Sequence, residues 1–196
     1  MQKVIFGGDI GTPKSVGYFV NSLQHLPLSV SLGNHDRDEQ GVATMGAYSA
    51  DNITFDFISP DDYRYIVLDS SKGYIAKSKK QWLTSAMDTE KQIILAVHHP
   101  IIPVPSYIDH KHALEGRERI QEILHMNRNE VTVLCGHYHL EDERRKGNIR
   151  QLVTPAASYL IEKSEELVFR DQLFGYRLLK ISPQCIETEV IYLKPN

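Results

Sequence analysis

The chain has few of the features that mark a secreted, membrane or nucleic-acid-binding protein. Its two cysteines, Cys135 and Cys185, lie far apart, and we expect both to pack as small hydrophobic residues in a reducing compartment. The longest apolar run, residues 93–97, ends at His98 and is too short to cross a bilayer. The N-terminus carries no apolar stretch of signal-peptide length. These shortages predict a cytoplasmic protein without a membrane span.

Basic residues are also not in excess. Lys and Arg number 22 against 25 Asp and Glu, a formal net charge of −3, so no nucleic-acid polymer is expected as a partner. A nucleotide-binding domain is disfavoured as well, because no Gly-x-Gly-x-x-Gly follows the first strand and no Walker-type lysine is present. With 196 residues, 41% of them apolar, the chain fits a single globular domain over residues 1–196.

The first third of the chain predicts a β-α-β unit. Residues 3–7 and 28–32 have the composition of buried strands, and Pro27 ends the segment between them. The apolar residues of that segment recur at helical spacing, namely Val16, Phe19, Val20, Leu23 and Leu26. A β-α-β unit favours a parallel sheet and therefore the α/β class.

The remaining two thirds continue this alternation. We expect a hairpin from residues 53–57 and 63–68, a helix from about Ser78, and a buried strand at 92–97. A Pro-rich loop at 101–112 and a long helix with Leu114 on its buried face should follow. A fourth strand is predicted at 131–135, and three further strand-like runs occupy residues 149–153, 176–181 and 186–193.

Four clusters of metal-type ligands follow apolar runs. They are Gly8-Asp9, Gly33-Asn34-His35-Asp36, His98-His99-Pro100 and Gly136-His137-Tyr138-His139. Each alone could be an ordinary turn, but ligands gathered at strand carboxyl ends match the usual place of sites in open α/β sheets. Carboxylate, amide and imidazole groups together suit Zn²⁺, Mn²⁺ or Fe²⁺, whereas Ca²⁺ prefers all-oxygen sites. The sequence therefore predicts a catalytic metal centre.

These clusters, in this order and spacing, resemble the calcineurin-like metallophosphoesterase family. The likeness runs from Val4 to about Leu193 and is greatest to the class III cyclic-nucleotide and glycerophosphodiester phosphodiesterases. Further matching segments are residues 67–71, 81–83, 98–101 and 175–179. The resemblance implies a four-layer α/β/β/α sandwich and a phosphodiesterase that cleaves a P–O bond of a small phosphoester with a metal-bound hydroxide.

The resemblance also implies a role for each matching residue. Asp9 would bridge two divalent ions, Mn, Fe or Zn. The second metal site would be completed by Asn34, His98 and His137, while His139 would belong to the first. His35 would stabilise charge on the substrate or protonate the leaving oxygen, with Asp36 orienting it. Asn34 and His99 would also contact the substrate.

One motif of that family has no counterpart here. An Asp-x-His at the end of an earlier strand should precede Gly8, but only seven residues lie upstream and none is Asp or His. The sheet would then lack its first strand, the domain would be incomplete at its N-terminus, and the first metal site would keep only Asp9 and His139. Three explanations stay open: a truncated or misassigned start, a natural short form that binds one metal or borrows ligands from a partner chain, or a degenerate member with little or no catalysis. A homodimer is compatible with an incomplete sheet.

Several other polar residues are not expected to bind metal. Asp109, His110 and His112 should be solvated or lie next to the substrate. The charged run at residues 115–119, which includes Arg117, should form the solvated face of a helix, and Tyr138 should point away from the two histidines that flank it and pack.

Overall fold

The computed structural model describes residues 3–37, 57–58 and 63–195. A six-stranded sheet with the order β3-β4-β5-β6-β8-β7 forms its centre. Neighbouring strands β4, β5, β6 and β8 are parallel, and β3 and β7 pair antiparallel at the two edges. The strand bounds are Phe57–Ile58 (β3), Tyr63–Leu68 (β4), Gln92–Val97 (β5), Val131–Cys135 (β6), Asp142–Lys146 (β7) and Ile149–Val153 (β8).

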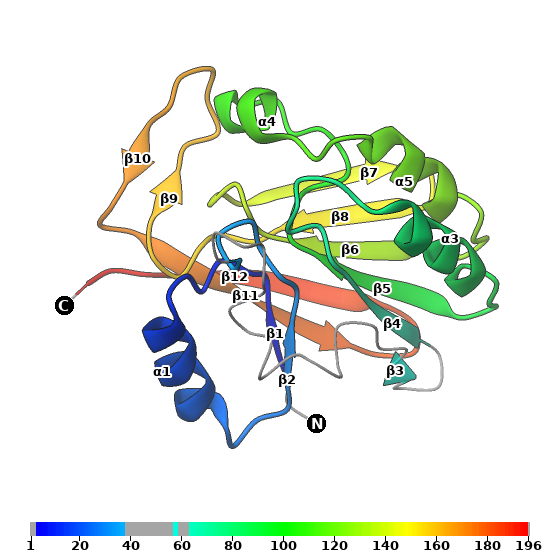
Figure 1. Ribbon diagram of the computed structural model, residues 1–196, viewed down its shortest axis with the longest axis horizontal. Helices are drawn as coiled ribbons and strands as arrows, with labels where there is room; N and C mark the ends of the chain where they lie inside the picture. The colour runs from blue at the N-terminus through cyan, green and yellow to red at the C-terminus, as the bar shows by residue number, and fades with distance from the viewer. Residues whose placement is uncertain (1–2, 38–56, 59–62, 196) are drawn as a thin grey trace.

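Two faces of this sheet bury different partners (Figure 1). One face packs against α3 (Lys77–Ala86) and α5 (Arg117–Leu124) through a large apolar cluster that includes Leu83 and Ile120. The opposite face packs against β1 (Val4–Phe6) through Ile5 and against the hairpin of β11 (Phe174–Ile181) and β12 (Ile186–Leu193). Strands that are buried on both faces explain the continuous apolar runs of β5 and β6.

The β1-α1-β2 unit supplies two strands on that face of the sheet and the helix outside them. Strands β1 and β2 (Leu28–Val30) are parallel, as predicted. Helix α1 (Pro13–Leu23) begins at Thr12, whose hydroxyl accepts the Ser15 N–H, and packs on the strands through Phe19, whose ring lies 4.5 Å from Phe6. The order helix, sheet, strands, helix is the expected α/β/β/α arrangement.

Some predicted elements differ from the structure. The supposed Pro-rich loop contains a helix, α4 (Tyr107–His112), because Ser106 accepts the Asp109 N–H and begins a turn. The predicted long helix is the eight-residue α5, since Gly116 adopts a left-handed conformation just before it and leaves Leu114 outside. Strands β7, β9 (Leu160–Ile161) and β10 (Phe169–Arg170) were not predicted. Residues 53–56 of the predicted hairpin lie outside the described residues.

Two expectations about composition have different outcomes. Cys135 is buried, as predicted, but the prediction for Cys185 is wrong, because its side chain is exposed in the turn between β11 and β12. Among the described helices, none combines the length and the apolar character that crossing a bilayer requires.

Candidate metal centre

Four strands, β1, β2, β5 and β6, deliver the predicted ligands to one edge. Strands β4, β5 and β6 run parallel, so the residues that follow them, among them His98 and His137, emerge on the same side. The parallel pair β1 and β2 brings Asp9 and Asn34 to that side as well. This is the edge where open α/β sheets place their sites.

Four donor atoms converge there, and we refer to them as the four-atom cluster: Asp9 Oδ2, Asn34 Oδ1, His98 Nε2 and His137 Nδ1. His98 Nε2 lies 3.2 Å from Asp9 Oδ2, 3.2 Å from Asn34 Oδ1 and 3.0 Å from His137 Nδ1. The structure therefore brings together four of the five predicted metal ligands.

Backbone carbonyls fix the tautomers of both imidazoles in the four-atom cluster. His98 Nδ1 donates to the Gly7 carbonyl at 2.6 Å, and His137 Nε2 donates to the His112 carbonyl at 3.1 Å. Burial lowers the pKa of His137 to about 2, so its ring is neutral near pH 7. In the His137 ring, the nitrogen that faces the cluster is then the one left with a lone pair, and the bond from His98 Nδ1 to Gly7 likewise leaves His98 Nε2 facing the cluster.

The donor set fits a divalent cation better than it fits a hydrogen-bond network. An N–H group at His98 Nε2 could donate to only one of the three neighbouring acceptors, whereas a cation could be coordinated by all four atoms. Burial opposes ionisation of Asp9, but a hydrogen bond and charge attraction from His98 outweigh it and hold the pKa of Asp9 below its ordinary value. One carboxylate, one amide oxygen and two imidazole nitrogens suit Zn²⁺, Mn²⁺ or Fe²⁺.

Backbone strain marks the same residues. Asp9, His137 and His139 have φ of 65°, 65° and 52°, and they are the non-glycine residues with left-handed backbone in the described part of the chain. Such conformations are unfavourable for residues with a Cβ and gather where function requires them. Three predicted ligands thus share a left-handed backbone, which is uncommon for residues other than glycine although Asp and His adopt it more readily than most.

Asp36 holds the loop that carries Asp9. Its side chain is fully buried, and its two oxygens accept N–H groups from Asp9 at 2.6 Å, Ile10 at 2.7 Å, Gly11 at 3.2 Å and Gly33 at 2.8 Å. These bonds join the loops after β1 and β2. Asp9 Oδ1 in turn accepts the His35 N–H at 2.8 Å, and the His35 side chain is exposed. That the Asp36 carboxylate orients the His35 imidazole stays a prediction.

The other two predicted residues lie beside the four-atom cluster. His139 Nδ1 donates to the Tyr159 carbonyl at 3.3 Å and its ring stacks 4.4 Å from that tyrosine. His99 is buried, bonds Ser70 Oγ through Nδ1 at 2.9 Å and lies 4.1 Å from the His137 ring. Among the described residues, His98, His99 and His137 present ring nitrogens within 4.8 Å of one another.

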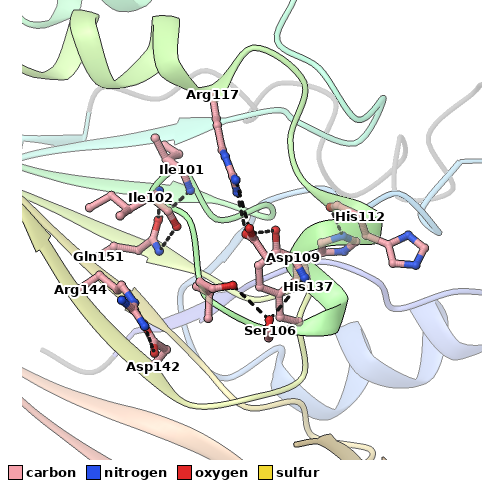
Figure 2. A network of polar contacts seen from close by, with 12 residues as sticks. Ile101, Ile102, Ser106, Asp109, His112, Arg117, His137, Asp142, Arg144 and Gln151 are labelled. Carbon is pink, nitrogen blue, oxygen red and sulfur yellow. Dashed lines mark hydrogen bonds and ion pairs between the residues drawn. The ribbon is translucent and has the colours of Figure 1, made fainter. Parts of the chain in front are cut away.

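A network of polar contacts around the buried Asp109 supports the segment that carries His137 and His139 (Figure 2). Asp109 accepts two bonds from Arg117, at 2.6 and 3.0 Å, and one from the Tyr138 hydroxyl at 2.8 Å. Asp109 is 5% exposed, so its expected solvation is wrong, as is that of Arg117, whose side chain is 13% exposed. Tyr138 is fully buried, as predicted, and its hydroxyl ties the segment between His137 and His139 to α4.

A second polar group supports the loop after His99. Gln151 is fully buried in β8; its Oε1 accepts the N–H groups of Ile101 and Ile102, both at 2.7 Å, and its Nε2 donates to the Ile102 carbonyl (Figure 2). The sequence reasoning missed this residue. The available signal was a glutamine that strand alternation places on the same face as the apolar Ile149 and Val153, since buried amides are retained where backbone groups need partners.

Close packing of two loops leads to a prediction about Gly33. A Cβ at Gly33 would overlap the Asp9 carboxylate and lie 2.6 Å from the Asp9 nitrogen. We therefore expect Gly33→Ala to displace Asp9 and weaken Mn²⁺ binding by at least tenfold, measured by calorimetric titration. Gly17→Ala is the control, because Gly17 lies in α1 with no atom within 4 Å of the added Cβ. Unchanged Mn²⁺ affinity in Gly33→Ala would contradict the assigned position of Asp9.

Comparison with known proteins agrees with this geometry. The sequence profile of the calcineurin-like phosphoesterase family matches residues 2–141. A probable glycerophosphodiester phosphodiesterase of Arcobacter nitrofigilis is 30% identical over 69% of this chain and 56% of its own length. The 3',5'-cyclic adenosine monophosphate phosphodiesterase CpdA of Pseudomonas aeruginosa is 27% identical over 79% of this chain and 59% of its own length.

Two further likenesses extend over nearly the whole chain. A probable cyclic nucleotide phosphodiesterase of Xenorhabdus bovienii is 25% identical over 98% of this chain and 83% of its own length. The crystal structure of a dimetal phosphatase from Danio rerio superposes with a TM-score of 0.66 at 11% identity, covering 99% of this chain and 84% of that one. The latter likeness concerns the fold. This chain belongs to the calcineurin-like phosphoesterase family.

Proposed function

We propose that this chain is a metal-dependent phosphoesterase that hydrolyses a small phosphodiester. The observation that carries the proposal is the convergence of Asp9, Asn34 and His137 on His98 Nε2 within 3.2 Å. The chain spans little more than half the length of two of the relatives above. Their names, with the family match, nevertheless support catalysis over the alternative of a degenerate member that binds one metal.

Asp9, Asn34, His98 and His137 would hold one divalent ion, and His139 with Asp9 would contribute to a second. Ions bound there would supply Lewis acidity toward the phosphoryl group and a nucleophile at neutral pH. Mn²⁺, Fe²⁺ and Zn²⁺ all suit these ligands. The cytoplasmic location and the homodimer expected from the sequence stay predictions.

The protein's own groups would position the substrate and transfer protons. The exposed His35 imidazole follows Asn34 directly, and its backbone N–H is fixed on Asp9 Oδ1. It can therefore reach a leaving oxygen beside the metal ligands and protonate it, or donate a hydrogen bond to the phosphoryl group. Asn34 and His99 line a pocket next to the four-atom cluster, which supports their proposed contact with the substrate.

Hydrolysis of bis(p-nitrophenyl) phosphate in the presence of Mn²⁺ tests this function. We expect turnover, and we expect His35→Ala to lower kcat by about 10²–10⁴-fold, the usual contribution of a general acid, with Mn²⁺ affinity unchanged. His25→Ala, at an exposed histidine after α1, is the control. A folded, Mn²⁺-loaded protein without turnover would refute the proposal, and one Mn²⁺ per chain without activity would favour the degenerate alternative.

A further inference from the structure

A pocket of about 280 Å³ opens beside the candidate metal centre. Part of its wall is formed by Ser71 and Lys72 after β4, His99 after β5, and His112 at the end of α4. Asn34 and His137 contribute to it as well as to the four-atom cluster. A phosphoryl group bound at that cluster would therefore direct one of its ester arms into this pocket.

The lining of the pocket is polar and basic. Lys72 supplies a formal positive charge, and no carboxylate is among the residues that the described part of the chain places in the wall. The nearby carboxylate of Asp69 is already occupied, because it pairs with Arg37 at 2.8 Å and accepts the Ser71 hydroxyl and N–H. The charge of Lys72 is therefore not offset by a partner in the pocket wall.

The pocket also lacks the surface that an apolar arm would need. Its side chains are imidazoles, an amide, a hydroxyl and an ammonium group, and the described lining has no aliphatic side chain larger than that of Ala113. Burying a lipid chain or a long alkyl arm against such a wall would gain little apolar contact. A short arm with polar or charged groups fits it better.

We propose that this pocket selects ester arms by charge. It takes a short polar arm that bears a carboxylate or phosphate, bound by Lys72, and disfavours arms that end in an ammonium group. This inference rests on the proposed function and specifies its substrate class: phosphodiesters of small anionic alcohols. Lys72 sets this preference, because among the described residues that line the pocket it alone carries a formal charge at pH 7.

Three phosphomonoesters of different arm charge test the proposal: 2-phosphoglycolate (anionic), glycerol 3-phosphate (neutral) and phosphocholine (cationic). Each has one arm, so its place in the pocket is unambiguous. Their affinities for the Mn²⁺-loaded protein are measured by calorimetry and as inhibition of bis(p-nitrophenyl) phosphate hydrolysis. We expect 2-phosphoglycolate to bind tightest and phosphocholine weakest.

Charge reversal at Lys72 should reverse that order. Lys72→Glu changes the charge at this position by two units, so it should weaken 2-phosphoglycolate binding on the order of tenfold or more and should strengthen phosphocholine binding. Lys77→Glu is the matched control, since Lys77 is exposed at the start of α3 and lies outside the lining. If the enzyme turns over substrate but Lys72→Glu leaves the order of the three affinities unchanged, this inference is wrong and the proposed function stands. If the protein shows neither turnover nor monoester binding, both the proposed function and the inference are wrong.

Discussion

Asp36→Asn should abolish the stabilisation of the protein by Mn²⁺ and lower its free energy of unfolding. The buried Asp36 carboxylate accepts four backbone N–H groups, whereas an asparagine would present N–H groups to two of them. Hydrogen bonds to a charged acceptor contribute about 1.5–3 kcal/mol each, and with partial relaxation we expect a loss of about 2–4 kcal/mol. The Asp9 loop would move, and the four-atom cluster would lose its carboxylate.

Thermal unfolding with and without Mn²⁺ measures both effects. The wild type should melt at a higher temperature with Mn²⁺, because a ligand that binds only the folded state stabilises it. Asp36→Asn should melt lower and show no such rise. Asp142→Asn is the control: Asp142 is a buried carboxylate that pairs with Arg144 and Lys163, so this variant should melt lower yet keep the Mn²⁺ response. A full Mn²⁺ response in Asp36→Asn would show that Asp36 does not position Asp9.

Much of the fold follows from the apolar pattern of the sequence. The strands at residues 92–97, 131–135 and 149–153 occur where they were predicted, and the first two are mainly apolar because strands buried on both faces form near-continuous apolar runs. Strand β7 does not follow this rule: Asp142–Lys146 carries only charged side chains. It lies at the edge of the sheet, where charged residues are favoured, and its arginines pair with Asp142 and Glu130.

The ligands of the candidate site were also predictable, but their geometry was not. Asp9, Asn34, His98 and His137 follow strands in the sequence, and parallel pairing brings them together. Nothing in a sequence pattern indicates that His98 Nδ1 bonds the Gly7 carbonyl, which selects the nitrogen that faces the cluster. Such bonds depend on two loops that are far apart in the chain.

Residues that support the ligand-bearing segments, without being ligands themselves, were the hardest to predict. Asp109 was expected to be solvated or next to the substrate, and Arg117 to lie on the solvated face of a helix, because both are charged residues in a segment rich in polar groups. Asp109 is buried and Arg117 is partly buried because α4 and α5 each contribute one partner to a bidentate pair, in which Asp109 also accepts the hydroxyl of the buried Tyr138. Burial of this kind requires three-dimensional proximity, and no period in the sequence encodes it.

The Asp109 pair gives the second large effect. Asp109→Ala would leave Arg117, with 13% of its side chain exposed, without its carboxylate, and breaking a buried pair in this way costs about 3–5 kcal/mol. Urea unfolding at pH 7 measures the loss. Arg119→Ala is the control, because the exposed pair of Arg119 with Glu122 should contribute at most about 1 kcal/mol. Comparable losses in the two variants would contradict a structural role for Asp109.

The pH dependence of the Asp109 pair separates its charge from its packing. Burial alone would raise the pKa of Asp109, but hydrogen bonds from Arg117 and Tyr138 outweigh it and lower that pKa below its ordinary value. A lowered pKa means that the pair stabilises the folded protein above about pH 4 and that this stabilisation is lost as the pH falls through the folded-state pKa. Asp109→Asn, which keeps the shape but cannot ionise, should therefore differ from the wild type by a constant amount at pH 5–7 and by progressively less below about pH 4. A difference that does not change between pH 7 and pH 3 would show that the carboxylate charge contributes nothing.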